Sequence, residues 1–311
     1  MRALVTGGAG FIGSHLVDRL LGDGANVVVL DDLSTGSEHN INAAADLVVG
    51  DVCDSDLLRR CARGVEVIFH LAARKSVARS VEQPLDTDRV NTGGTLAVLV
   101  AAHEAGIRRV VSSSSSSVYG GAEVRPTPES VVPAPRSPYA VSKLAAEQYC
   151  RVFHELHGIT AVSLRYFNVY GPRQLPGGPY AAVIPAFIAA LRRGEAPEVH
   201  GDGLQSRDFT YVDDVVAANL AAAVAEPTRC GGRSYNVAGG SEITLLDLLG
   251  HVETAIGRSV LPRFAPARAG DVRHSCADLA AAARDLGWSP QTSMTEGMAR
   301  TVAWFEQQGN Q

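Results

Sequence analysis

The stretch that decides the fold opens the chain and reads RALVTGGAGFIGSHLVDRLLGDGANVVVLDD (residues 2–32). Residues 3–6 are strand-like, and glycines then stand at positions 7, 10 and 13. Apolar side chains then recur at helical spacing until Gly22-Asp23-Gly24, which predicts the end of a helix. The continuous apolar run at 26–30 is typical of a parallel strand that is buried on both faces. The stretch therefore predicts a strand–helix–strand unit with a glycine-rich turn.

The glycines and the acid that ends the second strand indicate a dinucleotide ligand. A glycine-rich turn between a strand and a helix lets backbone N–H groups approach a pyrophosphate, and the helix N-terminus favours its charge. Asp31 stands about 20 residues beyond the turn, where a carboxylate binds both ribose hydroxyls of NAD. The same carboxylate would repel a 2′-phosphate, so the sequence favours NAD over NADP.

Strand and helix patterns alternate through the first half of the chain. Further strands are predicted at 47–49, 65–71, 108–111 and 160–164, with one helix ending near 106 and another spanning 138–157. This spacing indicates an α/β fold, namely a Rossmann-type doubly wound parallel sheet with helices on both faces. Ligands of such sheets bind at the carboxyl ends of the strands. Asp31, Asp51, Ala72 and a run of serines all fall at such ends.

The second half reads differently, because prolines and glycines interrupt it after Arg165. Helices are expected at about 182–193, 212–225, 243–257, 276–286 and 294–308, with one strand at 235–237. We expect residues 1–165 to form an NAD-binding domain and residues 166–311 to form mainly a smaller, mixed α/β substrate-binding lobe. The chain is expected to return to the first sheet around 210–238.

Composition limits the class of protein. The chain has 311 residues, of which 46% are hydrophobic, and its formal net charge is -5, so no basic footprint indicates a nucleic-acid partner. We recognise no signal peptide and no apolar run long enough to cross a bilayer, so a cytoplasmic protein without a membrane partner is expected. The five cysteines are scattered without metal-ligand spacing, and we predict reduced thiols and no metal site.

A second informative stretch runs from Val110 to Lys143. Six serines, 112–117, follow an apolar pair, and Tyr139 and Lys143 stand one helical turn apart. A phenol beside an ammonium can serve as a base, although the free pKa of a phenol is about 10. Of the 28 basic residues only Lys75 and Lys143 are lysines, which favours roles for them that arginine cannot take.

These motifs together resemble the extended short-chain dehydrogenase/reductases, and specifically the NAD-dependent nucleotide-sugar 4-epimerases. The motifs that carry the resemblance extend over nearly the whole chain: Gly7-x-x-Gly10-x-x-Gly13, DDLSTG at 31–36, Asp51-Val52, HLAA at 70–73, Asn91, the serine run with VYG at 118–120, Tyr139-x-x-x-Lys143, RYFNVYGPR at 165–173, GDG at 201–203, RDF at 207–209 and Arg268-x-Gly-Asp271.

The resemblance implies that NAD is held tightly and regenerated in every cycle. The residues it places at the cofactor are Gly7, Gly10, Phe11, Ile12, Gly13, Asp31, Asp32, Ser34, Gly36, Asp51, Val52, Leu71, Ala72, Ala73, Lys75, Tyr139, Lys143 and Tyr166.

For the reaction, the resemblance implies transient oxidation of a UDP-sugar at C4. Tyr139 would take the proton of the 4-hydroxyl, Ser115 would hydrogen-bond the same oxygen, and Lys143 with the nicotinamide charge would lower the pKa of Tyr139. The substrate contacts expected around these three catalytic residues are Ser115, Ser116, Ser117, Tyr139, Asn168, Arg207, Arg268 and Asp271.

The serine run also excludes related reactions. Similar dehydratases carry an Asp-Glu pair directly after the catalytic Ser or Thr, and sugar-acid decarboxylases carry a glutamate at the second of these positions. Here both positions are serines, Ser116 and Ser117, which are poor acid–base groups near neutral pH. Epimerisation needs no further acid or base, so it is the reaction that the run favours.

The sugar is indicated only by Arg192. It shares a predicted helical stripe with Ile184 and Ile188, and an extra guanidinium near the sugar could pair with a substrate carboxylate. This favours UDP-glucuronate interconverting with UDP-galacturonate. The alternatives are UDP-glucose with UDP-galactose or an N-acetylated pair, for which Ser275 leaves room at a position that gates bulky C2 groups.

Two other function classes stay open. A net oxidoreductase of the same family, such as a 4-keto reductase, would need an exchangeable cofactor, and Asp31 argues against NADPH. A non-catalytic NAD sensor would not need Tyr139, Lys143 and Ser115. The resemblance also implies a homodimer through helices around 87–105 and 138–157.

Overall fold

A computed structural model describes residues 1–175, 182–267 and 272–308. Its centre is a seven-stranded sheet in the order β11-β6-β5-β4-β1-β2-β3, in which all neighbours pair in parallel. The strands are β1 (Arg2–Thr6), β2 (Asn26–Asp31), β3 (Asp46–Val49), β4 (Val67–His70), β5 (Arg109–Ser115), β6 (Thr160–Tyr166) and β11 (Ser234–Val237). The order reverses between β1 and β4, so the carboxyl ends of these strands border the crevice where such sheets bind ligands.

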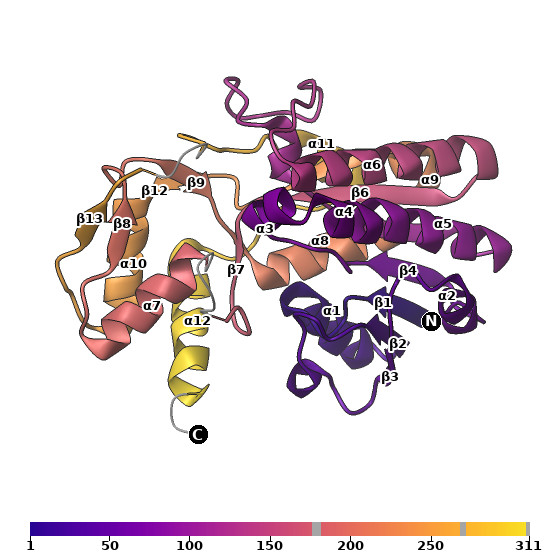
Figure 1. The fold of residues 1–311 in the computed structure, drawn as a ribbon, viewed down its shortest axis with the longest axis horizontal. Helices are drawn as coiled ribbons and strands as arrows, with labels where there is room; N and C mark the ends of the chain where they lie inside the picture. The colour runs from indigo at the N-terminus through magenta and orange to yellow at the C-terminus, as the bar shows by residue number, and fades with distance from the viewer. Residues whose placement is uncertain (176–181, 268–271, 309–311) are drawn as a thin grey trace.

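Helices cover both faces of the sheet (Figure 1). One core contains side chains of α1 (Phe11–Gly22), α8 (Val212–Val224) and α11 (Ala280–Leu286), and the other contains side chains of α2 (Ser55–Cys61), α5 (Gly94–Glu104) and α6 (Pro138–His157). Strand β1 shows why the strands are apolar throughout: Ala3 and Val5 enter the first core, whereas Leu4 enters the second.

A second lobe lies beside the sheet (Figure 1). It has its own core, formed mainly by apolar side chains of α7 (Val183–Arg193), α10 (Leu245–Ile256) and α12 (Met294–Gln308). Three two-stranded sheets lie outside the large sheet within the described residues: β10 (Thr210–Tyr211) with β7 (Val169–Tyr170), β12 (Glu242–Thr244) with β9 (Ser206–Asp208), and β13 (Arg263–Ala265) with β8 (Glu198–His200). The chain re-enters the large sheet with β11, which pairs with β6.

The structure corrects several expected boundaries. Strand β5 does not end at Val111 but continues to Ser115, because the serine backbone pairs with β6 as far as Tyr166. Helix α10 begins at Leu245, where Thr244 and Asp247 form a capping box, and α11 begins only at Ala280. The short elements between β4 and α5 were not predicted: α3 (Val77–Glu82), α4 (Pro84–Asp88) and a π-helical turn, η2 (Arg89–Gly93).

Each of the five cysteines carries a free thiol. None of the helices within the described residues is both long and apolar enough to span a membrane.

Candidate active site

A cleft opens at the carboxyl ends of the central strands. Of the residues predicted to contact the cofactor, all except Gly36 line it. The residues lining this cleft that were not predicted are Leu30, Thr35, Gly50, Arg74, Val90, Ser113 and Ser114. Gly36 has a packing role instead, because a Cβ atom on it would lie 2.8 Å from the Ala9 Cβ atom. It lets the loop after β2 pack against the glycine turn.

The glycine turn is too tightly packed for any side chain. Gly7 has a φ of 72°, and a Cβ atom on it would lie 2.6 Å from the Ala72 nitrogen, while one on Gly13 would lie 2.1 Å from the Gly7 oxygen. Gly10 is the N-cap of α1 and has no side chain to cap the first N–H groups of the helix. These N–H groups border the cleft, so the turn fits a pyrophosphate.

Asp31 is held in position at the end of β2. Its carboxylate accepts hydrogen bonds from the Ala9 nitrogen at 2.9 Å and from the Leu33 nitrogen at 2.8 Å. Burial raises the pKa of Asp31, and these two hydrogen bonds oppose that shift. Because each oxygen accepts one protein hydrogen bond and keeps a further lone pair, the carboxylate can still accept ribose hydroxyls.

Two cations follow β4 at the edge of the cleft. Lys75 is exposed and lines the cleft, and it makes no hydrogen bond or ion pair within the described part of the chain. Its ammonium is therefore available to a phosphate oxygen. Arg74, which the sequence did not single out, is bound to carboxylates instead, at 3.0 Å to Asp86 and 3.2 Å to Asp32.

Tyr139 is fixed at the start of α6. Ser137 caps this helix by accepting a hydrogen bond from the Ala140 nitrogen, and the Tyr139 nitrogen donates to the Ser80 Oγ atom at 3.1 Å. The Ser115 side chain is close enough to the Tyr139 hydroxyl to lower its pKa through hydrogen bonding. This contact joins the predicted base to the predicted catalytic hydroxyl.

The protein's own groups raise the pKa of Tyr139, and the expectation that Lys143 and the nicotinamide charge together lower it stays a prediction. Burial is the dominant cause, and the opposing influence is the hydrogen bond with Ser115. The Lys143 ammonium instead donates to the Ser113 carbonyl oxygen at 2.8 Å and to the Ser113 Oγ atom at 3.2 Å. Burial in turn lowers the pKa of Lys143 to about 8.

A buried hydrogen-bond network that the sequence did not predict packs against the end of β5 and the helix that carries Lys143. Ser114 donates to the Glu147 carboxylate at 2.5 Å, and the Arg165 guanidinium donates to the same carboxylate at 2.8 and 2.7 Å. Glu147 lies one helical turn after Lys143, and Ser114 directly precedes Ser115. The network therefore fixes the end of β5 against α6. In the sequence, the one hint of Glu147 is that it continues the four-residue spacing of Tyr139 and Lys143.

The two serines after Ser115 begin a short 3-10 helix, η3 (Ser116–Tyr119). The Ser117 nitrogen donates to the Ser115 Oγ atom at 3.2 Å. The Ser117 hydroxyl is buried and has no hydrogen-bond partner within the described residues. A buried hydroxyl without a partner is unfavourable, but Ser117 does not line the cleft described above.

The predicted diphosphate contacts lie at the second lobe. Asn168 donates to the Asp208 carbonyl oxygen at 3.1 Å, and Arg207 donates to the carbonyl oxygen of Ser206 at 2.9 Å. Neither residue lines the cleft described above. Arg268 and Asp271 lie outside the described residues. Tyr166 does line the cleft, and its hydroxyl bonds with Asn219 at 3.0 Å.

Arg192 lies away from the cleft, in the second lobe. The Arg192 Nη1 atom donates to the carbonyl oxygen of Phe305 at 2.7 Å, on α12. The side chain therefore packs across two helices of the second lobe, and it does not line the cleft. Helical spacing placed Arg192 on the stripe of Ile184 and Ile188, but the packing of α12 determines where its guanidinium goes. A contact between Arg192 and a substrate carboxylate stays a prediction, and this placement does not support it.

Comparison with known proteins agrees with this geometry. Residues 3–238 match the model of the NAD dependent epimerase/dehydratase family. The UDP-glucose 4-epimerase of Mycolicibacterium smegmatis is 44% identical over 312 residues, a match that covers 98% of each chain.

Two solved structures are similar over almost the full chain. The UDP-glucose 4-epimerase of Thermotoga maritima, solved with UDP-glucose, superposes with a TM-score of 0.94 at 39% identity and covers 99% of both chains. The UDP-N-acetylglucosamine 4-epimerase of Methanobrevibacter ruminantium, in complex with UDP-N-acetylmuramic acid, gives a TM-score of 0.94 at 38% identity and covers 99% of this chain and 98% of its own.

Proposed function

The chain belongs to the NAD dependent epimerase/dehydratase family and is an NAD-dependent UDP-sugar 4-epimerase, and we propose that it interconverts UDP-glucose and UDP-galactose. The observation that carries this proposal is the contact between Tyr139 and Ser115 beside the cleft, with serines rather than carboxylates at positions 116 and 117. Such a site can move a proton at one sugar oxygen but lacks the acids that water elimination or decarboxylation would need.

The chain's residues have distinct parts in this reaction. NAD, when bound, supplies the acceptor and donor of the C4 hydride. The Tyr139 oxygen takes the proton of the sugar 4-hydroxyl, and the Ser115 hydroxyl, hydrogen-bonded to Tyr139, orients that oxygen. Return of the proton to that oxygen, together with return of the hydride to the other face of C4, completes the cycle, so no net oxidation occurs.

Lys143 contributes charge and position. Its ammonium is anchored on Ser113 at 2.8 Å, so the cation is held at the base of the cleft. A fixed cation favours negative charge that develops on nearby oxygens. Small serine side chains also leave room for a sugar that must present both faces in turn.

The choice of sugar rests on the relatives together with Arg192. UDP-glucuronate was favoured only through a guanidinium facing the sugar, and that guanidinium is bonded to Phe305. The neutral pair, UDP-glucose and UDP-galactose, therefore becomes the main proposal. An N-acetylated pair is the next alternative, because Ser275 is small.

One experiment tests the substrate and the reaction class together. The purified protein is incubated without added NAD with UDP-glucose, UDP-N-acetylglucosamine or UDP-glucuronate, and the products are identified by NMR. We expect UDP-galactose to form fastest. Turnover of UDP-glucuronate alone would overturn the choice of sugar, and turnover that requires stoichiometric added cofactor would indicate a net oxidoreductase instead.

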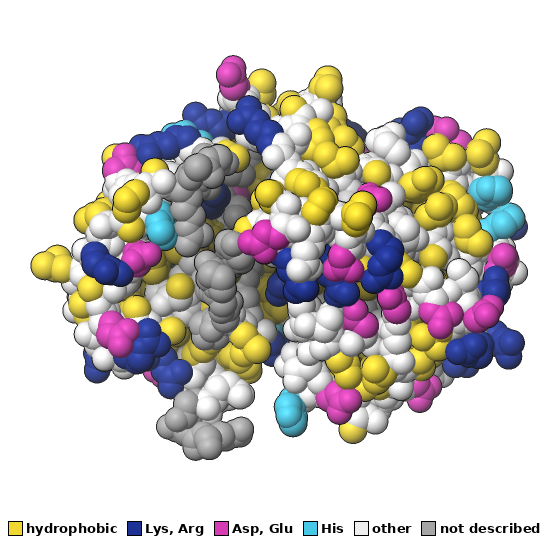
Figure 2. Space-filling model, viewed as in Figure 1, with side chains coloured by type: hydrophobic (Ala, Val, Ile, Leu, Met, Phe, Trp, Pro, Cys, Tyr) yellow, Lys and Arg dark blue, Asp and Glu magenta, His cyan; other side chains and the backbone are white. Residues whose placement is uncertain are grey.

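We also propose that the protein is a homodimer. Hydrophobic side chains gather on the face over α3 to α6 (Figure 2), where Val81 is 65% exposed, Leu85 86% and Val141 52%. A second copy that packs its own α5 and α6 against this face would cover them. Light scattering should give twice 32.7 kDa for the wild type and a monomer for Leu85→Glu. Leu261→Glu, a change at an equally exposed residue of the second lobe, should stay dimeric; a monomeric wild type would reject the proposal.

A further inference from the structure

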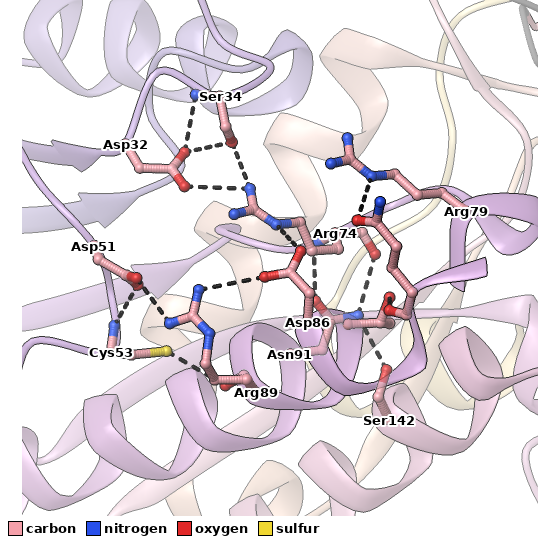
Figure 3. Close-up of polar contacts among 12 residues, drawn as sticks. Asp32, Ser34, Asp51, Cys53, Arg74, Arg79, Asp86, Arg89, Asn91 and Ser142 are labelled. Carbon is pink, nitrogen blue, oxygen red and sulfur yellow. Dashed lines mark hydrogen bonds and ion pairs between the residues drawn. The ribbon is translucent and has the colours of Figure 1, made fainter. Parts of the chain in front are cut away.

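A chain of ion pairs crosses the edge of the cofactor cleft, and Arg74 lies at its centre (Figure 3). The Arg74 Nη1 atom contacts the Asp32 carboxylate at 3.2 Å and the Ser34 hydroxyl at 2.5 Å, while the Nε atom contacts the Asp86 carboxylate at 3.0 Å. Asp32 and Ser34 belong to the loop after β2, whereas Asp86 belongs to α4. One side chain thus joins two segments that lie 40 or more residues apart in sequence.

A second arginine continues the chain toward the loop after β3. The Arg89 guanidinium contacts the Asp51 carboxylate at 2.8 Å and the Asp86 carboxylate at 3.4 Å. Asp86 therefore serves as a shared anchor for both arginines (Figure 3). The side chains of Arg89 and Asp51 are 48% and 42% exposed, against 18% for Arg74. Arg74 is the better shielded of the two links, so its contacts are the stronger ones.

The backbone beneath Arg74 is rigid. The Asn91 side chain accepts a hydrogen bond from the Arg74 nitrogen at 2.7 Å and donates to its carbonyl oxygen at 3.2 Å. Asn91 also donates to the Ser142 Oγ atom on α6 at 3.0 Å, and Asn91 itself is almost fully buried. The guanidinium therefore extends from a fixed point that is tied to the helix of Tyr139 and Lys143.

We propose that Arg74 is a latch that retains NAD in the cleft. Asp32, Ser34, Asp51 and Arg74 all line the cleft, and Asp31, which is positioned for the adenosine ribose, directly precedes Asp32. The guanidinium joins the loop after β2 to α4 next to that ribose position. Release of the adenosine half then requires the loop after β2 to separate from α4, and this separation breaks the contacts of Arg74 with Asp32 and Ser34.

Arg74 and its neighbour Lys75 have different roles. Lys75 has no partner within the described residues and is available to the phosphates, whereas Arg74 is bonded to protein groups on both sides. The planar guanidinium has five donors in a fixed fork and can bind two segments at once, which an ammonium does less well. A latch of this kind suits an enzyme whose NAD is regenerated in place, since loss of the cofactor would interrupt turnover.

The test measures cofactor release from the purified holoprotein. Wild type and Arg74→Gln are loaded with NAD, desalted and diluted, and the NAD that passes an ultrafiltration membrane is quantified over time. We expect release from Arg74→Gln to be about tenfold faster, since one charge-assisted link between the two sides is lost. Raising the salt concentration should speed release from the wild type more than from the variant, because salt screens the ion pairs.

Arg79→Gln is the matched control. Arg79 is a nearby arginine on α3 whose Nε atom contacts Gln83, on the same segment, at 3.3 Å. Its replacement should leave release at the wild-type rate. Equal release rates for wild type, Arg74→Gln and Arg79→Gln would overturn the proposal.

Two further variants separate a latch from a general loss of structure. Asp86→Asn removes the shared anchor, so it should speed the release of NAD. The double variant Asp86→Asn with Arg74→Gln should release NAD more slowly than the product of the two single effects predicts. Arg74→Lys keeps the charge but spans the two sides poorly, so its release rate should be intermediate. Independent, multiplying effects of Arg74 and Asp86 would reject the link between them, whatever sugar the enzyme uses.

Discussion

The Glu147 carboxylate and the Arg165 guanidinium form a bidentate ion pair in the interior, with N–O distances of 2.8 and 2.7 Å. Their side chains are only 2% and 6% exposed. The pair connects α6 to β6, and Ser114 on β5 donates to the same carboxylate. The end of the catalytic strand is thus fixed by the residue one turn after Lys143. Tyr139, Lys143 and Glu147 form one stripe of α6 that leads from the cleft to the buried ion pair.

Breaking this pair should destabilise the whole protein. Glu147→Gln leaves the buried Arg165 charge uncompensated, and we expect the free energy of unfolding to fall by about 3–5 kcal/mol. Glu155→Gln is the control on the same helix, since Glu155 pairs with Arg151 where both side chains are half exposed; its effect should stay below about 1 kcal/mol. Urea unfolding measures both, and equal effects would contradict the assigned role.

The sequence could predict the parts of this site that depend on local patterns. The glycine turn, Asp31 and the Tyr139–Lys143 pair follow from spacing along single elements, and the strands around them follow from apolar runs. Glu147 with Arg165 and Arg74 with Asp32 could not be predicted in this way. Their partners lie 18 and 42 residues away in sequence, and only the packing of the finished sheet brings them together.

Tyr139→Phe tests the base. Removing one hydroxyl should lower the rate of epimerisation by a factor of about 10² to 10⁴, because no other group is placed to take the proton. NAD content after desalting should stay near that of the wild type, which shows that the cleft is intact. Tyr149→Phe makes the same chemical change on the same helix, outside the cleft, and should leave the rate unchanged. Near-normal activity of Tyr139→Phe would refute the assignment.

The contact between Ser115 and Tyr139 predicts a pH effect. The hydrogen bond from Ser115 lowers the pKa of Tyr139 against the raising effect of burial. The phenolate is the active form, so the rate rises with pH until that pKa is reached. Ser115→Ala should therefore move the rising limb of the kcat/KM profile to higher pH, whereas Ser115→Thr should keep it in place. A shift of Ser115→Ala to lower pH would show that the sign is wrong.

Lys143 predicts a pH dependence of stability. Burial lowers its pKa from 10.5 to about 8 in the folded protein, so between these pH values the unfolded chain binds more protons than the folded one. The contribution of Lys143 to the free energy of unfolding therefore rises as the pH increases from about 8 to 10.5, and below pH 8 the buried charge is fully unfavourable.

Lys143→Met lacks this titration. Guanidinium unfolding between pH 7.5 and 10 should show the wild type gaining stability relative to Lys143→Met as the pH rises. The variant should also be inactive, since the cation beside the cleft is gone. A difference in stability that stays constant over this pH range would contradict the shifted pKa.

Arg192 provides the last prediction, because the structure and the sequence disagree about it. If its guanidinium only joins α7 to the Phe305 carbonyl oxygen, Arg192→Ala should change the kcat/KM values for UDP-glucose and UDP-glucuronate by the same small factor. The free energy of unfolding should fall by about 1 kcal/mol, the typical net value of one hydrogen bond. Arg193→Ala, which removes the neighbouring arginine and its exposed contact with Glu195, is the control. A selective loss of activity toward UDP-glucuronate in Arg192→Ala alone would show that this arginine reaches the substrate after all. Equal effects on both sugars would leave the sugar preference to residues other than Arg192.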